Sequence, residues 1–512
     1  MWPGREERLA GFRRIVPSEH DDSDMKTATV RGGAYTATSV AIDFILRMGS
    51  VAILARLLLP EHFGLIAMVL AITSVAERFK DLGLSLATVQ SREISHQQVS
   101  TLFWVNAGLG MACALTVALM AIPIADFYRD ERLVGITLAI SITFVWSGLT
   151  IQHEALLRRA MKFGYIAAIG LAANVLSMAV SIAMALYGCG YWSLVAREIA
   201  RSVFLAVGIW LACRWIPDPP SRQAGVASMM RFGGHIAATH LTALLSQNSG
   251  SIVVGRFFGA SPAGFYRQGQ NLVLFPFEQL SYPVWIVSEP ILSRLQDDPE
   301  KYRRYYGKLL TMFSGITLPL GVYLMIYAEE IVLFVLGPTW TDATLIFRLM
   351  AASALITPTA STIGLVMVTC GRSQRYLALG LLGATMLVAF SIIGASWGPA
   401  GVAAAPILAA GLLLVPRLYF GLRGTPVSIG NFFTCLTRPM TAAVIMGISL
   451  VALKAVARAD GALVTLSIGA VAAVATYLVG WALLPGGRAE LVELTGDVVR
   501  ALRRRRAVQR PA

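Results

Sequence analysis

Charged side chains inside long apolar stretches are the residues of this chain best placed to do chemistry. Asp43 and Arg47 are four residues apart, so they share one face of a helix and can pair. A charge in the middle of a bilayer costs at least ~2.5–3.5 kcal/mol, and a residue that carries one there usually serves a function. The spacing predicts that both side chains line a wet cavity. A structural ion pair that fixes the first helix is the alternative.

Three further apolar stretches carry polar or charged residues at helical spacing. Because exposing a polar helix face to lipid is costly in free energy, the helices that carry such faces should border a common cleft. The residues predicted to bind substrate in this cleft are Arg47, Arg78, Arg267, Gln247 and Asn271. The residues predicted to act in coupling or gating are Asp43, Glu77 and Glu278. The alternative is pairing within each half of the chain, in which Arg78 would meet Glu77 or Asp81. Glu278 would then meet Arg267.

The elements that must hold these residues are membrane helices. The chain has 512 residues, of which 56% are hydrophobic and 14% charged, and its mean hydropathy is +0.65. Soluble domains carry roughly 25% charged residues. About fourteen stretches reach the ~20 apolar residues that cross the ~30 Å hydrocarbon core. The sequence therefore predicts an all-α polytopic membrane protein with about 14 transmembrane helices.

The net charge of +14 follows from the predicted topology. Lysines and arginines gather in every second loop and in both tails, which the positive-inside rule places in the cytoplasm. Both termini are therefore predicted to be cytoplasmic, and no nucleic-acid partner is needed to explain the charge. The five cysteines have no ligand spacing, which predicts neither a metal site nor a disulfide. Without a Walker A or H-E-x-x-H motif, the sequence predicts no cofactor and no enzyme.

An internal repeat organises the chain. At an offset of 200 residues two long stretches align without a gap, and matched pairs include Arg31–Arg231, Arg56–Arg256 and Gly64–Gly264. Since the offset spans six predicted helices, the two copies should have the same orientation in the membrane, as in transporters built from parallel repeats. The predicted parts are a tail (1–30), a first lobe (31–215), a linker (216–228), a second lobe (229–421), a helix pair (436–484) and a basic amphipathic cytoplasmic tail (485–512).

One pair of equivalent positions carries opposite charges. Arg78 in the first copy corresponds to Glu278 in the second. A two-fold axis would place the two positions at equal distances from the cleft, so they are predicted to form a weak latch when the lobes approach. Pairing of each charge within its own lobe is the alternative.

Several segments resemble a known family of transporters. These are LLPEHFGLIAMV (58–69), DLGLSLATVQSREISHQQVSTLFWVN (81–106), EALLRRAMKFGYIA (154–167) and EEIVLFVLGPTW (329–340). They are similar to the polysaccharide-transporter branch of the multidrug/oligosaccharidyl-lipid/polysaccharide exporter superfamily, and most of all to Wzx-like oligosaccharide flippases of the colanic-acid-exporter type. One departure is His153-Glu154, where the family commonly has proline.

The resemblance implies a bacterial inner-membrane flippase with two six-helix lobes around a central cavity. By alternating access it would move a polyprenyl-pyrophosphate-linked oligosaccharide, which is a repeat unit of exopolysaccharide, capsule or lipopolysaccharide. Basic cavity residues would engage the pyrophosphate, a role that suits Arg47 and Arg78. A proton or sodium gradient would drive the cycle through Asp43, Glu77 or Glu278. Membrane lipids, a polysaccharide polymerase and its chain-length machinery are the implied partners.

Two other functions remain open at this point. A cation-coupled multidrug antiporter of the same superfamily would need unpaired carboxylates for cationic drugs, and Asp43 and Glu278 are candidates. A polysaccharide polymerase or membrane glycosyltransferase should carry a long outer loop with acid–base or sugar-binding residues. The longest predicted connections have roughly 15–20 residues, which is typical of linkers.

Overall fold

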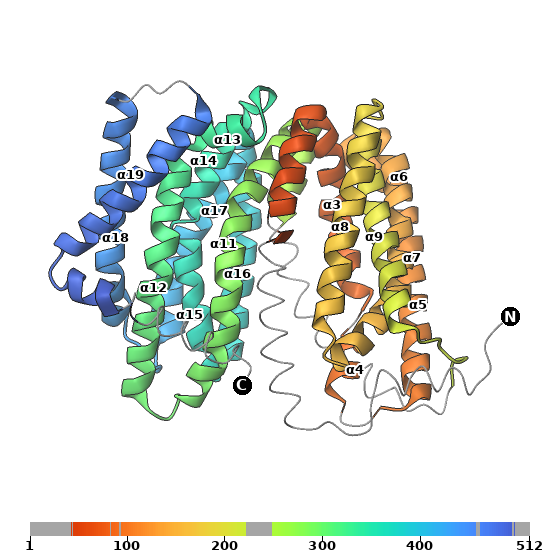
Figure 1. The fold of residues 1–512 in the computed structure, drawn as a ribbon, viewed down its shortest axis with the longest axis horizontal. Helices are drawn as coiled ribbons and strands as arrows, with labels where there is room; N and C mark the ends of the chain where they lie inside the picture. Colours follow the sequence, from red (N-terminus) through yellow and green to blue (C-terminus); the bar gives the residue numbers. More distant parts are fainter. Residues whose placement is uncertain are drawn as a thin grey trace, which may run out of the picture. The chain divides into compact units, whose positions relative to one another are not determined.

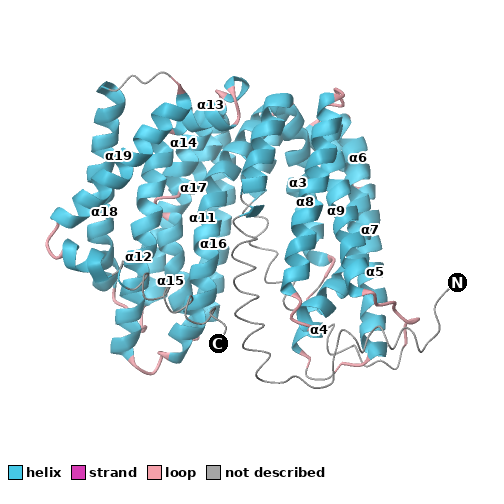
Figure 2. Cartoon of the chain, viewed as in Figure 1, coloured by secondary structure: helices cyan, strands magenta, loops and turns pink. Residues whose placement is uncertain are grey.

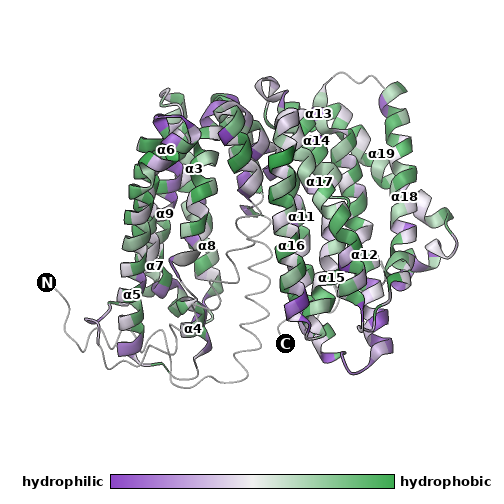
Figure 3. Cartoon of the chain, turned by 180° about the vertical axis from the view of Figure 1, so that it is seen from behind, coloured by the Kyte–Doolittle hydropathy of each residue, from purple (hydrophilic) through white to green (hydrophobic). Residues whose placement is uncertain are grey.

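The fold is all-α, as the sequence predicts. The structure is a computed structural model that describes residues 42–43, 45–81, 83–91, 94–221, 248–456, 461–493 and 496, without the side chains of Arg78 and Phe79. Within these ranges the chain forms helices joined by short turns, and no strand is found (Figure 2). Apolar residues cover much of the helices, whereas hydrophilic ones gather at helix ends (Figure 3).

Eight helical segments of the described chain are long and apolar enough to cross a membrane. They are His96–Leu119, Arg132–Arg159, Phe163–Leu186, Pro299–Ile326, Ala343–Thr369, Ser373–Gly421, Ile429–Val456 and Ala462–Leu483. The segment Ser373–Gly421 has 49 residues and contains two helices joined by a turn. Helix α9 (Trp192–Cys213) is not among the eight, since it carries Arg197, Glu198 and Arg201. The protein is a multi-pass membrane protein, and its predicted count of fourteen spans stays a prediction.

The chain divides into two compact units, Met1–Arg267 and Gln268–Ala512. In unit 1, α5 packs on α7, α7 on α9 and α9 on α8, and α3 contacts α5, α7 and α9 (Figure 1). Its helices are residues 45–57, α3 (Pro60–Phe79), α4 (Leu84–Gln90), α5 (His96–Leu119), α6 (Ala121–Tyr128), α7 (Arg132–Arg159), α8 (Phe163–Leu186), α9 (Trp192–Cys213), residues 248–258 and the start of α11 (Ala260–Arg294).

Local sequence signals explain where the helices of unit 1 begin. Pro60 opens α3, where its missing N–H costs no hydrogen bond. Ser95 and Gln98 form a reciprocal capping box at the start of α5: each side chain accepts a hydrogen bond from the backbone N–H of the other residue. Gly83 adopts φ 71° just before α4, a backbone conformation that favours glycine.

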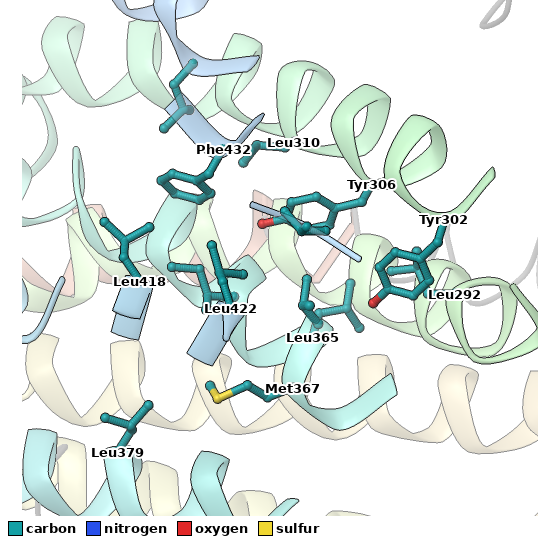
Figure 4. Close-up of a cluster of buried hydrophobic side chains, with 14 residues drawn as sticks. Leu292, Tyr302, Tyr306, Leu310, Leu365, Met367, Leu379, Leu418, Leu422 and Phe432 are labelled. Atoms are coloured by element: carbon teal, nitrogen blue, oxygen red, sulfur yellow. The ribbon is translucent and has the colours of Figure 1, made fainter. Parts of the chain in front are cut away.

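Unit 2 is built around α12 and α15. Buried tyrosines of α12 reach α15, where the hydroxyls of Tyr302 and Thr369 lie 2.7 Å apart and those of Tyr306 and Thr362 lie 2.9 Å apart. Leucines, Met367 and Phe432 pack around these tyrosines (Figure 4). Beyond α11 the elements are α12 (Pro299–Ile326), α13 (Ala328–Val335), η1 (Pro338–Trp340), α14 (Ala343–Ser353), α15 (Thr357–Thr369), α16 (Ser373–Gly394), η2 (Ala395–Trp397), α17 (Gly398–Pro416), η3 (Arg417–Gly421), α18 (Ile429–Val456) and α19 (Ala462–Leu483).

The last two helices, α18 and α19, dock on glycines of α12. A Cβ on Gly307 would lie 3.2 Å from Sγ of Cys435, and a Cβ on Gly315 would lie 3.0 Å from the Trp481 ring. Ion pairs hold both ends of the helix pair. Nζ of Lys454 lies 2.7 Å from Glu330, and Nη1 of Arg438 lies 2.8 Å from Glu490 in the segment after α19. Nζ of Lys308 on α12 lies 2.9 Å from Glu493 in the same segment.

Equivalent positions of the internal repeat meet in unit 1. A Cβ added at Gly64 of α3 would overlap the carbonyl of Ala260, and one added at Gly264 of α11 would overlap the carbonyl of Pro60. The two contacts are reciprocal, as they are wherever a two-fold axis relates two copies. Residues 248–267 pack on α3, which explains why they belong to unit 1. The predicted boundaries of the lobes stay predictions.

This contact predicts that even the smallest side chain at Gly64 is harmful. Gly64→Ala should lower the thermal unfolding midpoint of the detergent-purified protein, because overpacking costs about 1–3 kcal/mol. Gly264→Ala should act similarly. The double variant should lose less than the sum of the two, since both substitutions disturb one contact.

Gly108→Ala is the matched control, because a Cβ at Gly108 of α5 would meet no heavy atom within 4 Å. Its unfolding midpoint should stay near that of the unmodified protein. Equal midpoints for Gly64→Ala and Gly108→Ala would mean that the α3–α11 contact is not tight.

Candidate functional site

A hydrogen-bonded network links three helices of unit 1 at the first pair of residues that the sequence singles out. Nε of Arg47 donates to Oδ2 of Asp43 over 2.7 Å, so the predicted i,i+4 pair is formed. Oδ1 of the same carboxylate accepts from Nδ2 of Asn174 on α8 over 2.6 Å. Oδ1 of Asn174 accepts in turn from Nε of Arg201 on α9 over 2.8 Å. The network thus runs from the first helix through α8 to α9.

Asn174 and Arg201 lie far from both ends of their helices, and Arg47 lies far from the C-terminal end of the first helix. Asn174 is midway along α8 (Phe163–Leu186). Arg201 is nine residues from the start of α9, and Arg47 is nine residues before Arg56 in the first helix. At 1.5 Å per residue each of these separations is about 14 Å, roughly half of a hydrocarbon core. Arg201 is also twelve residues from the other end of α9, so its side chain cannot comfortably reach either end of the helix.

The network is only partly covered by the protein. The side chain of Arg47 is 47% exposed and that of Asp43 23% exposed, and Arg201 is an exposed residue. Charged groups at this depth cannot face lipid hydrocarbon without a large cost in free energy. This cost is avoided where the uncovered side faces water or a polar ligand, and the wet cavity lined by Asp43 and Arg47 stays a prediction.

Two more charges of α9 lie beside the network. Arg197 is half-buried and is acted on by the charges of Glu198, Arg201 and Arg47. The network and its neighbours therefore combine three guanidinium groups with two carboxylates, those of Asp43 and Glu198. Among the described residues this is an excess of one positive charge, which favours an anionic ligand.

Sequence reasoning missed the residue that joins this network. The sequence analysis assigns no role to the apolar stretch that forms α8, yet Asn174 within it connects Asp43 to Arg201. A single amide in an apolar helix is a weak signal, although hydrogen-bonding side chains are rare enough in such helices to be noted. Ser50, three residues after Arg47, is buried, and its hydroxyl donates to the carbonyl O of Arg47 over 2.9 Å.

The charged end of α3 forms local contacts. Glu77 pairs with Lys80 one turn further along the helix. Asp81 accepts from the backbone N–H of Ser85 over 2.9 Å and from its hydroxyl. The side chain of Arg78 lies outside the described residues, so its predicted role in binding and in the latch stays a prediction.

The predicted stripe on α11 falls on one helix. Arg267 and Asn271 are half-buried, whereas Glu278 is exposed. Arg267 and Glu278 both have interaction partners. Gln247, the remaining predicted member, lies outside the described residues. The roles proposed for these residues stay predictions.

The His153-Glu154 departure has a structural role. His153 is fully buried and stacks on Trp210 of α9 with ring centroids 4.1 Å apart. Its Nε2 lies 3.1 Å from the carbonyl O of Trp215. Glu154 pairs with Arg158 one turn along α7. The histidine therefore fastens the segment after α9 to α7, and the glutamate is balanced locally.

That segment, residues 214–221, is also tied to α5. The backbone N–H of Asp218 donates to Oγ of Ser100 over 3.0 Å, and Nε1 of Trp104 donates to the carbonyl O of Asp218 over 2.8 Å. The carboxylate of Asp218 lies 3.2 Å from Nδ1 of His96. These contacts fix the part of the predicted linker that the structure describes.

The chain contains one sequence of the form Gly-x-Ser-x-Gly, which is Gly394–Gly398. It forms the η2 turn between α16 and α17, where the hydroxyl of Ser396 donates to the carbonyl O of Ile393 over 2.8 Å. A catalytic serine of this motif stands on a turn from strand to helix. The motif is therefore a helix–helix turn. In the described part of the chain, no group of three or more His, Cys, Asp or Glu residues is arranged to hold a metal ion.

A comparison with protein families decides the broader identity. A family model described as "Polysaccharide biosynthesis protein" matches residues 53–345. The chain belongs to this family. Among similar proteins, lipopolysaccharide biosynthesis protein WzxC of Escherichia coli (strain K12) is 26% identical over 354 residues, which cover 68% of this chain and 71% of WzxC. Succinoglycan biosynthesis transport protein ExoT of Rhizobium meliloti (strain 1021) is 26% identical over 428 residues, which cover 83% and 86% of the two chains.

The fold of this polysaccharide biosynthesis protein is that of a known transporter. The structure of lipid II flippase MurJ in an inward closed conformation aligns with a TM-score of 0.73 and 13% sequence identity. The alignment covers 89% of this chain and 98% of the MurJ chain. At this identity the likeness establishes the fold and leaves the activity to be argued from the site.

The network predicts that the carboxylate of Asp43 is needed for stability. Asp43→Leu removes an acceptor that serves two donors, one of them charged, and should destabilise the protein by roughly 1–3 kcal/mol. The change is measured as a lower thermal unfolding midpoint in detergent. Asp43→Asn keeps an acceptor and should lose less.

Glu154→Leu is the control, because Glu154 pairs with Arg158 at the same i,i+4 spacing and is 24% exposed, against 23% for Asp43, but within the described residues it accepts hydrogen bonds from Arg158 alone. An isolated, partly exposed pair contributes only about 0–1 kcal/mol. Equal losses for Asp43→Leu and Glu154→Leu would contradict a cooperative network.

Proposed function

We propose that this protein is a flippase that moves a polyprenyl-pyrophosphate-linked oligosaccharide across the bacterial inner membrane by alternating access. The oligosaccharide would be a repeat unit of exopolysaccharide, capsule or lipopolysaccharide. Two relatives are named as a lipopolysaccharide biosynthesis protein and a succinoglycan biosynthesis transport protein. These names support a polysaccharide repeat unit as the transported substrate. No chemical reaction is part of the proposal, and both termini are proposed to be cytoplasmic.

One observation carries the proposal. The network of Asp43, Arg47, Asn174 and Arg201 holds two guanidinium groups, each about nine residues from one end of its helix, with one side uncovered. A pyrophosphate is a compact anion with several acceptor oxygens, and arginine binds such groups through two parallel N–H donors. The lipid tail of such a substrate can remain in the bilayer while its headgroup passes the network.

The same network argues against a multidrug antiporter. A cationic drug needs a carboxylate that is not already neutralised. Here the carboxylate of Asp43 accepts hydrogen bonds from Arg47 and Asn174. The described charged side chains around Asp43 carry a net positive charge, which repels a cation. A proton or sodium gradient and the pathway's polymerase and chain-length machinery remain proposed partners.

Deletion of the gene tests the function directly. The deletion strain should accumulate the lipid-linked oligosaccharide on the cytoplasmic leaflet and should lose the cell-surface polysaccharide. Extraction of the lipids and mass spectrometry identify the sugars, and an impermeant sugar-oxidising reagent reports the leaflet. A deletion strain with normal lipid-linked intermediates and altered drug resistance would favour the antiporter.

Arg47 is predicted to be essential for export. In the complemented deletion strain, Arg47→Ala should abolish surface polysaccharide, because the pyrophosphate loses a charge-assisted donor. Arg47→Lys should retain part of the export, since a lysine keeps the charge but not the fork. Protein levels in the membrane should stay near normal in both variants.

Arg158→Ala is the matched control, because Arg158 also pairs with a carboxylate four residues earlier in its helix. It should export normally. Loss of the Arg47→Ala protein from the membrane, or recovery of export in the Asp43→Ala/Arg47→Ala double variant, would instead establish a purely structural ion pair.

A further inference from the structure

Asn174 makes two hydrogen bonds of opposite kind. Its amide nitrogen donates to Asp43 over 2.6 Å, and its amide oxygen accepts from Arg201 over 2.8 Å. A neutral amide can do both at once, whereas a carboxylate can only accept. The residue therefore joins the Asp43–Arg47 pair to the arginine of α9 without adding a charge.

The donor atoms that the network uses are informative. Both arginines are held through Nε, Arg47 by Asp43 and Arg201 by Asn174. Within the described ranges Arg201 makes no ion pair with a carboxylate, and its side chain is exposed. Its position is thus fixed by an uncharged partner, so its positive charge is not cancelled by the group that orients it.

The local charge balance depends on residue 174 being neutral. Among the described residues, Arg47, Arg197 and Arg201 bring three positive charges, and Asp43 and Glu198 bring two negative ones. A carboxylate at position 174 would have almost the same shape as the asparagine but would cancel the excess. It would also repel the carboxylate of Asp43 at hydrogen-bonding distance.

We propose that Asn174 is a positioning residue that aligns Arg201 with Arg47 as a two-arginine site for the diphosphate of the lipid-linked substrate. The inference rests on the proposed function and deepens it, because it assigns the anionic headgroup to the first helix, α8 and α9. Arg201 contacts the diphosphate in this arrangement, and Asn174 acts through Arg201 and Asp43. A diphosphate binds best where several charged donors face it together. The side-chain amide of Asn174 holds Arg201 on the side of the network where Arg47 lies.

Binding of short polyprenyl probes to the full-length protein in detergent tests this site. Farnesyl diphosphate is the anionic probe and farnesol is the neutral probe of equal chain length, with both affinities measured by native mass spectrometry. We expect the unmodified protein to prefer farnesyl diphosphate. Asn174→Asp and Arg201→Gln should each weaken farnesyl diphosphate binding at least tenfold and leave farnesol binding unchanged. Arg201→Lys should lie in between.

Asn106→Leu is the matched control. Asn106 is also an asparagine that joins two helices of unit 1, since its Nδ2 donates to Oε1 of Gln152 over 3.2 Å, but its partner is uncharged. The variant should keep the preference for the diphosphate even where its thermal unfolding midpoint falls. A structural role for Asn174 would likewise lower the midpoint and weaken both probes equally.

The outcomes separate the two proposals. An unmodified protein that binds farnesyl diphosphate no better than farnesol would overturn the proposed substrate itself. A clear preference in the unmodified protein that survives in Asn174→Asp and Arg201→Gln would overturn only the two-arginine site. An unchanged ratio of the two affinities in a destabilised variant counts as the second result.

Discussion

A charge in the hydrocarbon core must be paired, hydrogen-bonded or wetted, and this constraint explains the arrangement of unit 1. Arg201 lies nine residues from the start of α9 and Arg47 nine residues before Arg56, so each is about half a membrane thickness from that end of its helix. Asp43 and Asn174 satisfy one donor of each arginine and so connect three helices. The helices that carry charges are therefore held by polar contacts, while their apolar faces remain available for lipid and neighbouring helices. Fold and candidate site depend on the same few side chains.

The contacts that the sequence predicts well are those within one helix. Four-residue spacing predicts the Asp43–Arg47 pair because both partners share a helix face. The spacing cannot reveal that Asn174, more than a hundred positions later, is the second donor to the Asp43 carboxylate. No local pattern shows which helices become neighbours. His153 shows the same limit. As a lone departure from a family pattern it suggests an unusual charge, whereas the fold buries it against Trp210.

The all-α membrane fold follows from composition and from the length of the apolar stretches, because a bilayer leaves few alternatives. The repeat is also visible in the sequence as the alignment of Gly64 with Gly264. Their direct contact is not visible there, since equivalence in a repeat says nothing of distance. The number of spans and the boundaries of the lobes stay predictions. The same holds for the roles of Arg78, Gln247 and Glu278, because no pattern within one helix determines them.

The close packing of α18 and α19 on the glycines of α12 has a consequence for shortened forms of the protein. Gly307 and Gly315 leave stretches of bare backbone that Cys435 and Trp481 cover. Lys308, left behind on α12, would lose Glu493 as its partner. A chain ending before Ile429 would thus leave the backbone at Gly307 and Gly315 uncovered and would remove one ion pair of Lys308. The pair α18 and α19 thus packs as part of unit 2, and a shortened protein without this pair would need larger side chains on the surface of α12.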